Sequence, residues 1–171
     1  NPMIELTIPL SLGDSYKGFR IVGTNHEYPK LYKVNLATGK FWDRAMEVVI
    51  GSNVVEACQL KIGSTFYSSH GFVEGGPIHN KYAFKVVGIL DKSNTIIDQL
   101  ILTNSESISK VHNHKDHSNH SHEIVEEECS VKNSVMITAM LVKFRSLVGL
   151  INFPRQVNET TNLQAVVPAF E

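Results

Sequence analysis

The chain has 171 residues, of which 42% are hydrophobic and 19% are charged, a balance typical of a folded domain rather than a disordered one. Sixteen Lys and Arg residues against 17 Asp and Glu residues give a net charge of −1, which argues against a broad nucleic-acid-binding surface. The sequence has no apolar run near the ~20 residues that a membrane-spanning helix needs. Because the chain opens on Asn1-Pro2, without Met or a signal peptide, we expect a soluble piece of a longer protein.

Runs rich in β-branched and aromatic residues recur along the chain and predict strands. They lie at 4–12, 19–23, 47–51, 63–69, 82–90, 96–102, 134–144 and 163–167. The first two runs are separated by the turn-rich stretch GDSYKG, which favours a hairpin.

Short helices are predicted between several of these strands. A short irregular or helical piece is expected to begin at Tyr28-Pro29, and helices are expected at 53–60, 105–111 and 147–153. Ser52 is expected to cap the helix at 53–60, and Pro154 to follow the end of the helix at 147–153. Because strands and short helices alternate irregularly, we predict the α+β class with a mixed sheet.

The stretch His112–Glu128 differs in composition from the rest of the chain. It holds five of the eight His residues, and its one Lys against five acidic residues gives a charge of −4. Because it contains too little apolar surface to offset the conformational entropy lost on folding, we expect a mobile loop between a helix and a strand.

Imidazole and carboxylate groups at this density favour binding of a divalent metal. The candidate ligands are His112, His114, Asp116, His117, His120, His122 and Glu123. Zinc is the first choice, and copper and nickel remain open. Nothing in the sequence indicates residues that would hold these ligands rigidly in place. We therefore expect the stretch to bind the metal at about micromolar concentration, without a pre-formed site. A solvated linker without a role and a pH-responsive segment remain as alternatives.

The glycine-rich stretch 69–80 is predicted to be a loop. Its residues His70, Glu74 and His79 form a secondary metal candidate, since two imidazoles and a carboxylate can hold a metal. A surface loop with turn-forming polar residues is the alternative that we favour. Asp14, like other Asp residues at turns and strand edges, is expected to serve only as a turn or capping residue.

Motifs that would indicate catalysis are absent from the sequence. It has no GxSxG elbow, no phosphate-binding loop and no HExxH, so we predict that the protein is not an enzyme and requires no cofactor. Cys58 and Cys129 lack the spacing of a metal or redox motif, and the sequence leaves open whether they form a disulfide.

Several blocks together resemble a known family in their order and spacing. The blocks are IPLSLGDSYKGFRIVGT, NLATGKFW, EVVIGSNVVEACQLKIGSTF, YAFKVVGILDKSNTIIDQLILTNSESISKVH and the closing LINFPRQVNETTNLQAVVPAFE. They are similar to the extracytoplasmic domain, or periplasmic core domain, of ABC transporter permeases of the MacB/FtsX type. The nearest likeness is to a metal-associated or uncharacterised branch.

This resemblance implies an architecture. A porter-like α/β part would comprise residues 1–26 and 100–171, and a smaller β-rich lobe, residues 27–99, would be inserted into it, with the His-rich loop at 112–128. The domain would be truncated at its N-terminus, because an initial strand–helix segment of the family is missing.

The resemblance also implies a role. The domain would lie outside the inner membrane in a membrane-embedded, dimeric permease, without catalysis of its own. It would couple ATP hydrolysis by a cytoplasmic ATPase to a periplasmic protein, lipoprotein or other substrate, and the His-rich loop would extend this role to zinc handling. The alternative is a free-standing periplasmic metal-binding protein or metallochaperone.

Overall fold

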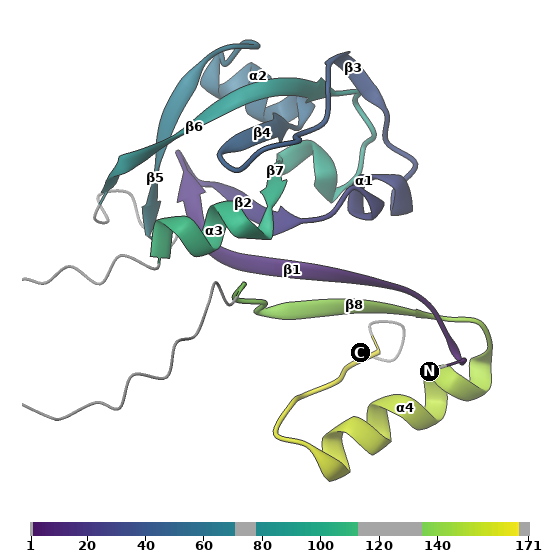
Figure 1. The fold of residues 1–171 in the computed structure, drawn as a ribbon. Coiled ribbons are helices and arrows are strands. Elements are labelled where there is room, and N and C mark those ends of the chain that lie inside the picture. Colours follow the sequence, from purple (N-terminus) through teal and green to yellow (C-terminus); the bar gives the residue numbers. More distant parts are fainter. Residues whose placement is uncertain (1, 71–77, 113–134, 168–171) are drawn as a thin grey trace, which may run out of the picture. The chain divides into compact units, whose positions relative to one another are not determined.

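A computed structural model describes residues 2–70, 78–112 and 135–167 (Figure 1). The chain divides into two compact units, one of Pro9–Ala139 and one of Asn1–Ile8 with Met140–Glu171. The partition that the resemblance implies, with a lobe at 27–99, has different bounds and remains a prediction.

The strands form one mixed sheet, as the sequence predicts. They are β1 (Ile4–Tyr16), β2 (Phe19–Thr24), β3 (Leu36–Gly39), β4 (Glu47–Ile50), β5 (Thr65–His70), β6 (Ile78–Leu90), β7 (Leu100–Asn104) and β8 (Ala139–Phe144). The order is β2-β7-β4-β6-β5-β1-β8, with β3 beside β6. Because β1 also pairs with β2, the path from β2 to β1 closes on itself. The pairs β2–β7 and β4–β6 are parallel, whereas β1–β2, β1–β5, β4–β7 and β5–β6 are antiparallel.

The helices are short, apart from the last one. They are α1 (Glu27–Leu31), α2 (Ser52–Cys58), the 3-10 turn η1 (Ile96–Gln99), α3 (Ser105–His112) and α4 (Leu147–Thr160). Asn104 caps α3, since its Oδ1 accepts a hydrogen bond from the Ser107 N–H at 2.8 Å. The predicted cap of α2 is wrong, because Ser52 is already helical and Gly51 occupies the N-cap without a side-chain bond.

The hairpin of β1 and β2 is confirmed, but its turn lies later than the sequence suggests. Gly13-Asp14 does not end the strand, because a bulge between Ser11 and Asp14 lets β1 continue to Tyr16. Lys17 and Gly18 then form the turn with φ of 47° and 82°, the left-handed geometry that matches the twist of a two-residue hairpin. Asp14 consequently lies inside a strand rather than in a loop.

Four further element predictions need correction. The strand expected at 96–102 begins only at Leu100, because Ile96–Gln99 forms η1. The strand expected at 134–144 is regular only from Ala139. Helix α4 runs through Pro154 to Thr160 instead of stopping before the proline. The strand expected at 163–167 is irregular chain.

The loop expected at 69–80 is shorter than predicted. Ser69 and His70 belong to β5, and β6 already begins at Ile78, while residues 71–77 lie outside the described part. The apolar core lies in the unit Pro9–Ala139, where Phe84, Ile101 and Val48 are fully buried.

Helix α3 packs closely on β2. A Cβ atom at Gly23 would lie 2.9 Å from the Ser105 Cα and 2.7 Å from the Ile108 side chain. The absence of a side chain at Gly23 is therefore what allows this approach. Helix α3 is therefore held close to β2 (Figure 1).

Candidate functional site

The described part of the chain brings three polar side chains together at the end of α3. Asp14 of β1 has a fully buried side chain, and its Oδ1 lies 3.1 Å from Nε2 of His112, whose side chain is 15% exposed. The hydroxyl of Ser68, a buried residue of β5, donates a hydrogen bond of 3.0 Å to the other carboxylate oxygen. We call Asp14, Ser68 and His112 the junction.

Three separate elements position the junction. The bulge in β1 shifts the register of the strand. After the shift, Asp14 pairs with Ile21 of β2 on one side and with His70 of β5 on the other. The next pair along is Ser15 with Ser69, and the hydroxyls of these two serines lie 3.4 Å apart. Since β5 ends at His70 and α3 ends at His112, both elements end at the same place on the sheet.

The junction is a buried carboxylate next to a partly exposed imidazole. Burying a carboxylate is costly unless other groups compensate for the lost hydration, and the Ser68 hydroxyl and the His112 ring supply that compensation. A carboxylate oxygen and an imidazole nitrogen are also the ligands that zinc accepts besides thiolate. The pair therefore links the end of α3 to β1 and offers two of the ligand types that zinc accepts.

The sequence-predicted ligands are described only in part. Of the primary set, the structure places His112, and the remaining six lie outside the described residues: His114, Asp116, His117, His120, His122 and Glu123. Of the secondary set, His70 and His79 lie in β5 and β6, and Glu74 lies outside the described part. Within the described ranges, no three His, Cys, Asp or Glu side chains come together in a group that could hold a metal ion.

Asp14 and Ser68 are the functional candidates that sequence reasoning missed. Gly13-Asp14 has the composition of a turn, and Ser68 lies in a serine-rich run, so neither pattern marks a buried polar contact. No local signal separates them from turn residues, because the bulge between Ser11 and Asp14 breaks the alternation that the buried Ile8 and Leu10 begin.

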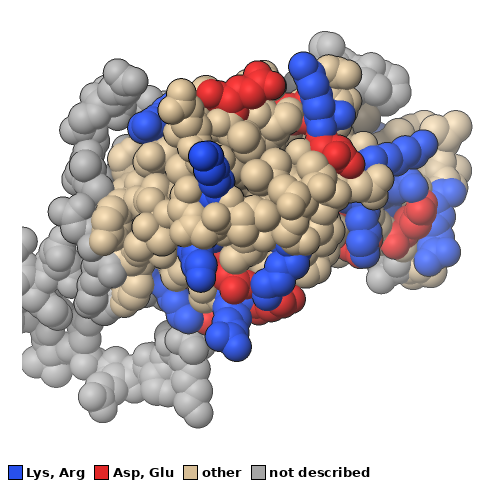
Figure 2. All heavy atoms as spheres, turned by 90° about the horizontal axis from the view of Figure 1, so that it is seen from above, with Lys and Arg blue, Asp and Glu red and all other residues tan. Residues whose placement is uncertain are grey.

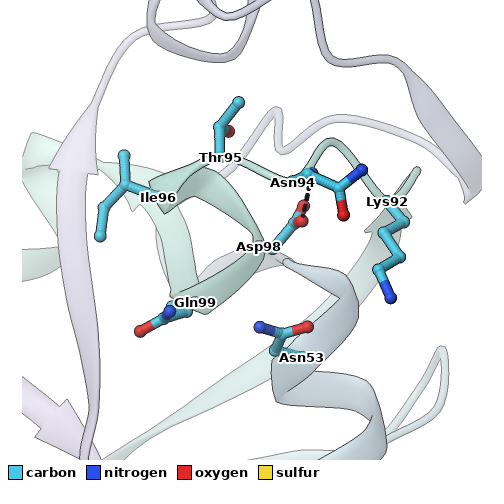
Figure 3. Close-up of a pocket in the computed structure, with 7 residues that line it drawn as sticks. All are labelled: Asn53, Lys92, Asn94, Thr95, Ile96, Asp98 and Gln99. Atoms are coloured by element: carbon cyan, nitrogen blue, oxygen red, sulfur yellow. Dashed lines mark hydrogen bonds between the residues drawn. The ribbon is translucent and has the colours of Figure 1, made fainter.

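A surface hollow lies beside η1, away from the residues of the junction. Its volume is about 530 Å³, and its lining is mostly polar (Figure 3). The lining residues are Asn53, Lys92, Asn94, Thr95, Ile96, Asp98 and Gln99. This hollow is shallow and polar.

Asp98 organises the loop beside this hollow. Its carboxylate accepts hydrogen bonds from the backbone N–H and the hydroxyl of Ser93 and from the backbone N–H of Asn94, at 2.7–3.1 Å. Burial opposes ionisation of Asp98, but these hydrogen bonds outweigh it, so that the pKa of the carboxyl lies below its ordinary value. Because its oxygens are already engaged by the loop, we assign Asp98 a structural role.

The one cysteine in the described ranges, Cys58, does not point to a site. Cys58 is a half-buried free thiol at the end of α2, and burial raises the pKa of this thiol, which makes it a weaker nucleophile at neutral pH. Cys129 lies outside the described residues, so a disulfide between the two stays untested.

The surface seen in Figure 2 mixes both signs of charge. Basic and acidic side chains alternate around a largely uncharged centre on that face. In the described ranges, no helix combines the length and the apolar character that crossing a membrane requires.

Comparison with known proteins finds relatives by structure and not by sequence. No protein-family model matches the chain, and no curated protein matches it significantly. The periplasmic region of MacB from Actinobacillus actinomycetemcomitans aligns with a TM-score of 0.54 and 13% identity, over 93% of this chain and 68% of that chain. The extracellular domain of the noncanonic ABC-type transporter YknZ from Gram-positive bacteria aligns with a TM-score of 0.53 and 10% identity, over 93% and 78% of the two chains.

Because the sequence identities are only 13% and 10%, the alignments establish the fold alone. They do so over 93% of this chain. The mixed sheet with short helices is thus shared with two domains that lie outside the membrane in their own proteins. The likeness seen in the sequence is confirmed at this level: the chain has the fold of the MacB periplasmic region.

Proposed function

We propose that this chain is the extracytoplasmic domain of an ABC transporter permease. The observation that carries the proposal is the alignment of 93% of the chain with the domains of MacB and YknZ. The sequence blocks that resemble the MacB/FtsX type support the same assignment independently of the coordinates.

In this proposal the domain is a non-catalytic coupling module. The polypeptide that contains it is embedded in the inner membrane as a dimer, binds a cytoplasmic ATPase, and passes motion driven by ATP hydrolysis to a periplasmic protein, lipoprotein or other substrate. The closed path of strands around a buried apolar core supports such a role, because close-packed interiors have low compressibility and transmit strain.

Fractionation of cells that express the whole polypeptide tests the assignment. The protein should remain in the membrane fraction after a high-salt wash, and an ABC ATPase should co-purify with it in mild detergent. Recovery in the periplasmic fraction without an ATPase would contradict the proposal and support the alternative, a free-standing periplasmic metal-binding protein.

We further propose that the permease handles zinc through the His-rich stretch 112–128. The support is compositional, since five imidazoles and five carboxylates occur within this stretch and these are the groups that bind zinc, copper and nickel. Zinc is the metal we assign, because nothing in the stretch indicates redox chemistry.

Calorimetric titration of chelator-stripped protein at neutral pH tests this second proposal. The 171-residue chain should bind zinc with a Kd of about a micromolar or lower, near −8 kcal/mol. A variant with residues 113–128 replaced by a Gly/Ser linker of equal length should lose this binding but keep its circular dichroism spectrum. Binding only at about millimolar zinc would contradict zinc handling and leave the permease assignment untouched.

A further inference from the structure

The smaller unit leaves a group of apolar side chains in contact with water. On α4 the side chains of Leu147, Val148 and Ile151 are exposed by 74%, 60% and 66%, and after the helix those of Leu163 and Val166 are exposed by 71% and 56%. We call these five residues the apolar face. They are the five most exposed large apolar residues in the described chain, and such a concentration marks an interaction surface.

The helix period gathers this group on one side of α4. Leu147 and Ile151 are four residues apart and Asn158 follows seven residues later, so all three lie along one side of the helix. The side-chain amide of Asn158 bonds the backbone of Ala165 twice, at 2.6 and 3.0 Å. The chain that returns after α4 (Figure 1) is therefore tied to the exposed side of the helix. The other side packs inward, because Gly149 is buried against the ring of Phe144.

The charges around the apolar face are compatible with a second copy of the same surface. Residues 146–154 contain no charged side chain. Charged neighbours are compensated within the unit, because Arg155 pairs with Glu159 at 2.7 Å and Lys143 pairs with Glu5 at 2.8 Å. Two identical surfaces that meet across a two-fold axis must avoid facing like charges, and the apolar face meets this condition.

An antiparallel pair of α4 helices also brings complementary charges together. With Ile151 at the two-fold axis, Glu159 of each copy comes to lie near the N-terminal end of α4 in the other copy. That end of a helix carries a partial positive charge, and Arg145 lies just before it. The smaller unit comprises only about 40 residues, a size at which association is a common way to complete an apolar core.

We propose that the apolar face is a homodimer interface, in which α4 packs antiparallel on α4 of a second copy about Ile151. The inference adds a contact surface to the dimer of the proposed function. Because it is tested on the purified chain, without the ATPase or the membrane, its failure and the failure of the permease assignment are distinguishable.

A charge exchange at Ile151 tests the two-fold contact by sedimentation equilibrium. The 171-residue chain should be monomeric at about 1 µM and dimeric at about 200 µM, as mass action requires of a small interface. Ile151→Glu and Ile151→Lys should each stay monomeric, because like charges then face each other across the axis. An equimolar mixture of the two variants should dimerise again. Both variants change an exposed side chain and should keep the circular dichroism spectrum of the wild type.

Gln156 provides the matched control on the same helix. It is exposed and lies five residues after Ile151, which turns it well away from the apolar face. Gln156→Glu and Gln156→Lys should each dimerise like the wild type. In the whole polypeptide with all other cysteines replaced by Ser, Ile151→Cys should be cross-linked to a dimer by a short bismaleimide in isolated membranes, and Gln156→Cys should not.

Four results would overturn the proposal. They are a wild type that stays monomeric at all concentrations, association that persists in Ile151→Glu, a mixture of the two charged variants that stays monomeric, and equal cross-linking of Ile151→Cys and Gln156→Cys. Binding of a monomeric wild type to phosphatidylcholine vesicles, lost in Ile151→Glu, would assign the apolar face to a lipid surface instead.

Discussion

The two units of the chain differ in what they bury. The unit Pro9–Ala139 contains nearly all of the fully buried apolar side chains, including Phe84, Ile101 and Leu102. In the unit of Asn1–Ile8 and Met140–Glu171, helix α4 instead leaves Leu147 and Ile151 exposed by 74% and 66%. Apolar residues occur in both units, but among its described residues the smaller unit fully buries only the apolar side chain of Ile8.

This difference indicates where the stability of the chain resides. Burial of an apolar side chain stabilises a protein by about 1.5–3 kcal/mol, and exposed ones contribute almost nothing. In the smaller unit the described packing consists of contacts such as Phe144 with Phe153, whose ring centroids lie 5.3 Å apart, and Gly149 against the Phe144 ring. We therefore expect substitutions in the larger unit to dominate the free energy of unfolding.

The largest effect is expected for Phe84→Ala. Phe84 is fully buried and stacks on Phe66 at 5.7 Å between ring centroids, so its truncation should lower the free energy of unfolding by about 3–5 kcal/mol. Urea denaturation measures this change. Phe144→Ala in the smaller unit is the matched control and should cost about 1 kcal/mol; equal losses in both variants would remove the distinction between the units.

A methyl group added at Gly51 should have the next largest effect. The new Cβ would collide with the backbone carbonyl oxygens of Ile97 and Asp98, and such overpacking costs about 1–3 kcal/mol. In Gly149→Ala in α4, the new Cβ would press against the Phe144 ring. The higher helix propensity of Ala contributes about 1 kcal/mol, so the net change in the free energy of unfolding should be near zero. The midpoints of urea denaturation compare the two, and a neutral Gly51→Ala would contradict the close packing of η1 on α2.

Asp98→Asn should cost about 1–2 kcal/mol at pH 7, because it removes a charged acceptor of several hydrogen bonds. The folded-state pKa of Asp98 is lowered, so its contribution is present above the unfolded-state pKa of about 3.9 and is lost as the pH falls through the folded value. The stability difference between wild type and variant should therefore shrink below about pH 4. In the smaller unit, Glu159→Gln removes an exposed ion pair with Arg155 and should change stability by less than about 0.5 kcal/mol.

The smallest effect is expected for Leu147→Ser with Ile151→Ser on α4. Both side chains are largely exposed, so the double variant should keep the free energy of unfolding within about 1 kcal/mol of the wild type. Its solubility should rise, because exposed apolar groups promote association. Light scattering at increasing protein concentration measures this, and a large loss of stability would show that the face is buried after all.

Much of the larger unit could be predicted from the sequence, because its strands are runs rich in β-branched and aromatic residues that are buried at successive positions. The runs around Phe19–Gly23, Glu47–Ile50 and Tyr82–Leu90 are strands in the structure. The turn at Lys17-Gly18 was harder to place, because Gly13-Asp14 offers the same turn-like composition and only the bulge in β1 decides between them. A bulge depends on pairing with another strand and leaves no local signal.

The C-terminal region shows the opposite outcome. Pro154 predicted a helix end, but α4 continues past it. A proline inside a helix removes one backbone N–H and crowds the carbonyl group four residues earlier, which can kink a helix without ending it. The apolar and β-branched residues at 163–167 predicted a strand, yet no partner strand pairs with these residues in the described chain. Instead, the side-chain amide of Asn158 bonds the backbone of Ala165 in both directions, at 2.6 and 3.0 Å.

The candidate site was predictable only in its composition. The density of histidines identified His112, but the contact with Asp14 depends on the register of β1 and the packing of α3 on β2. These are long-range features that a local pattern does not encode.

The measurement that tests the permease assignment most directly is labelling in intact cells. Glu56 is exposed on α2. In the whole polypeptide with Cys58→Ser, Cys129→Ser and every cysteine outside these 171 residues also replaced by Ser, Glu56→Cys presents one thiol to a membrane-impermeant maleimide. A domain outside the cytoplasmic membrane should be labelled in cells whose outer envelope admits the reagent, and the labelled polypeptide should sediment with the membranes. Labelling only after lysis of the cytoplasmic membrane would contradict the assignment.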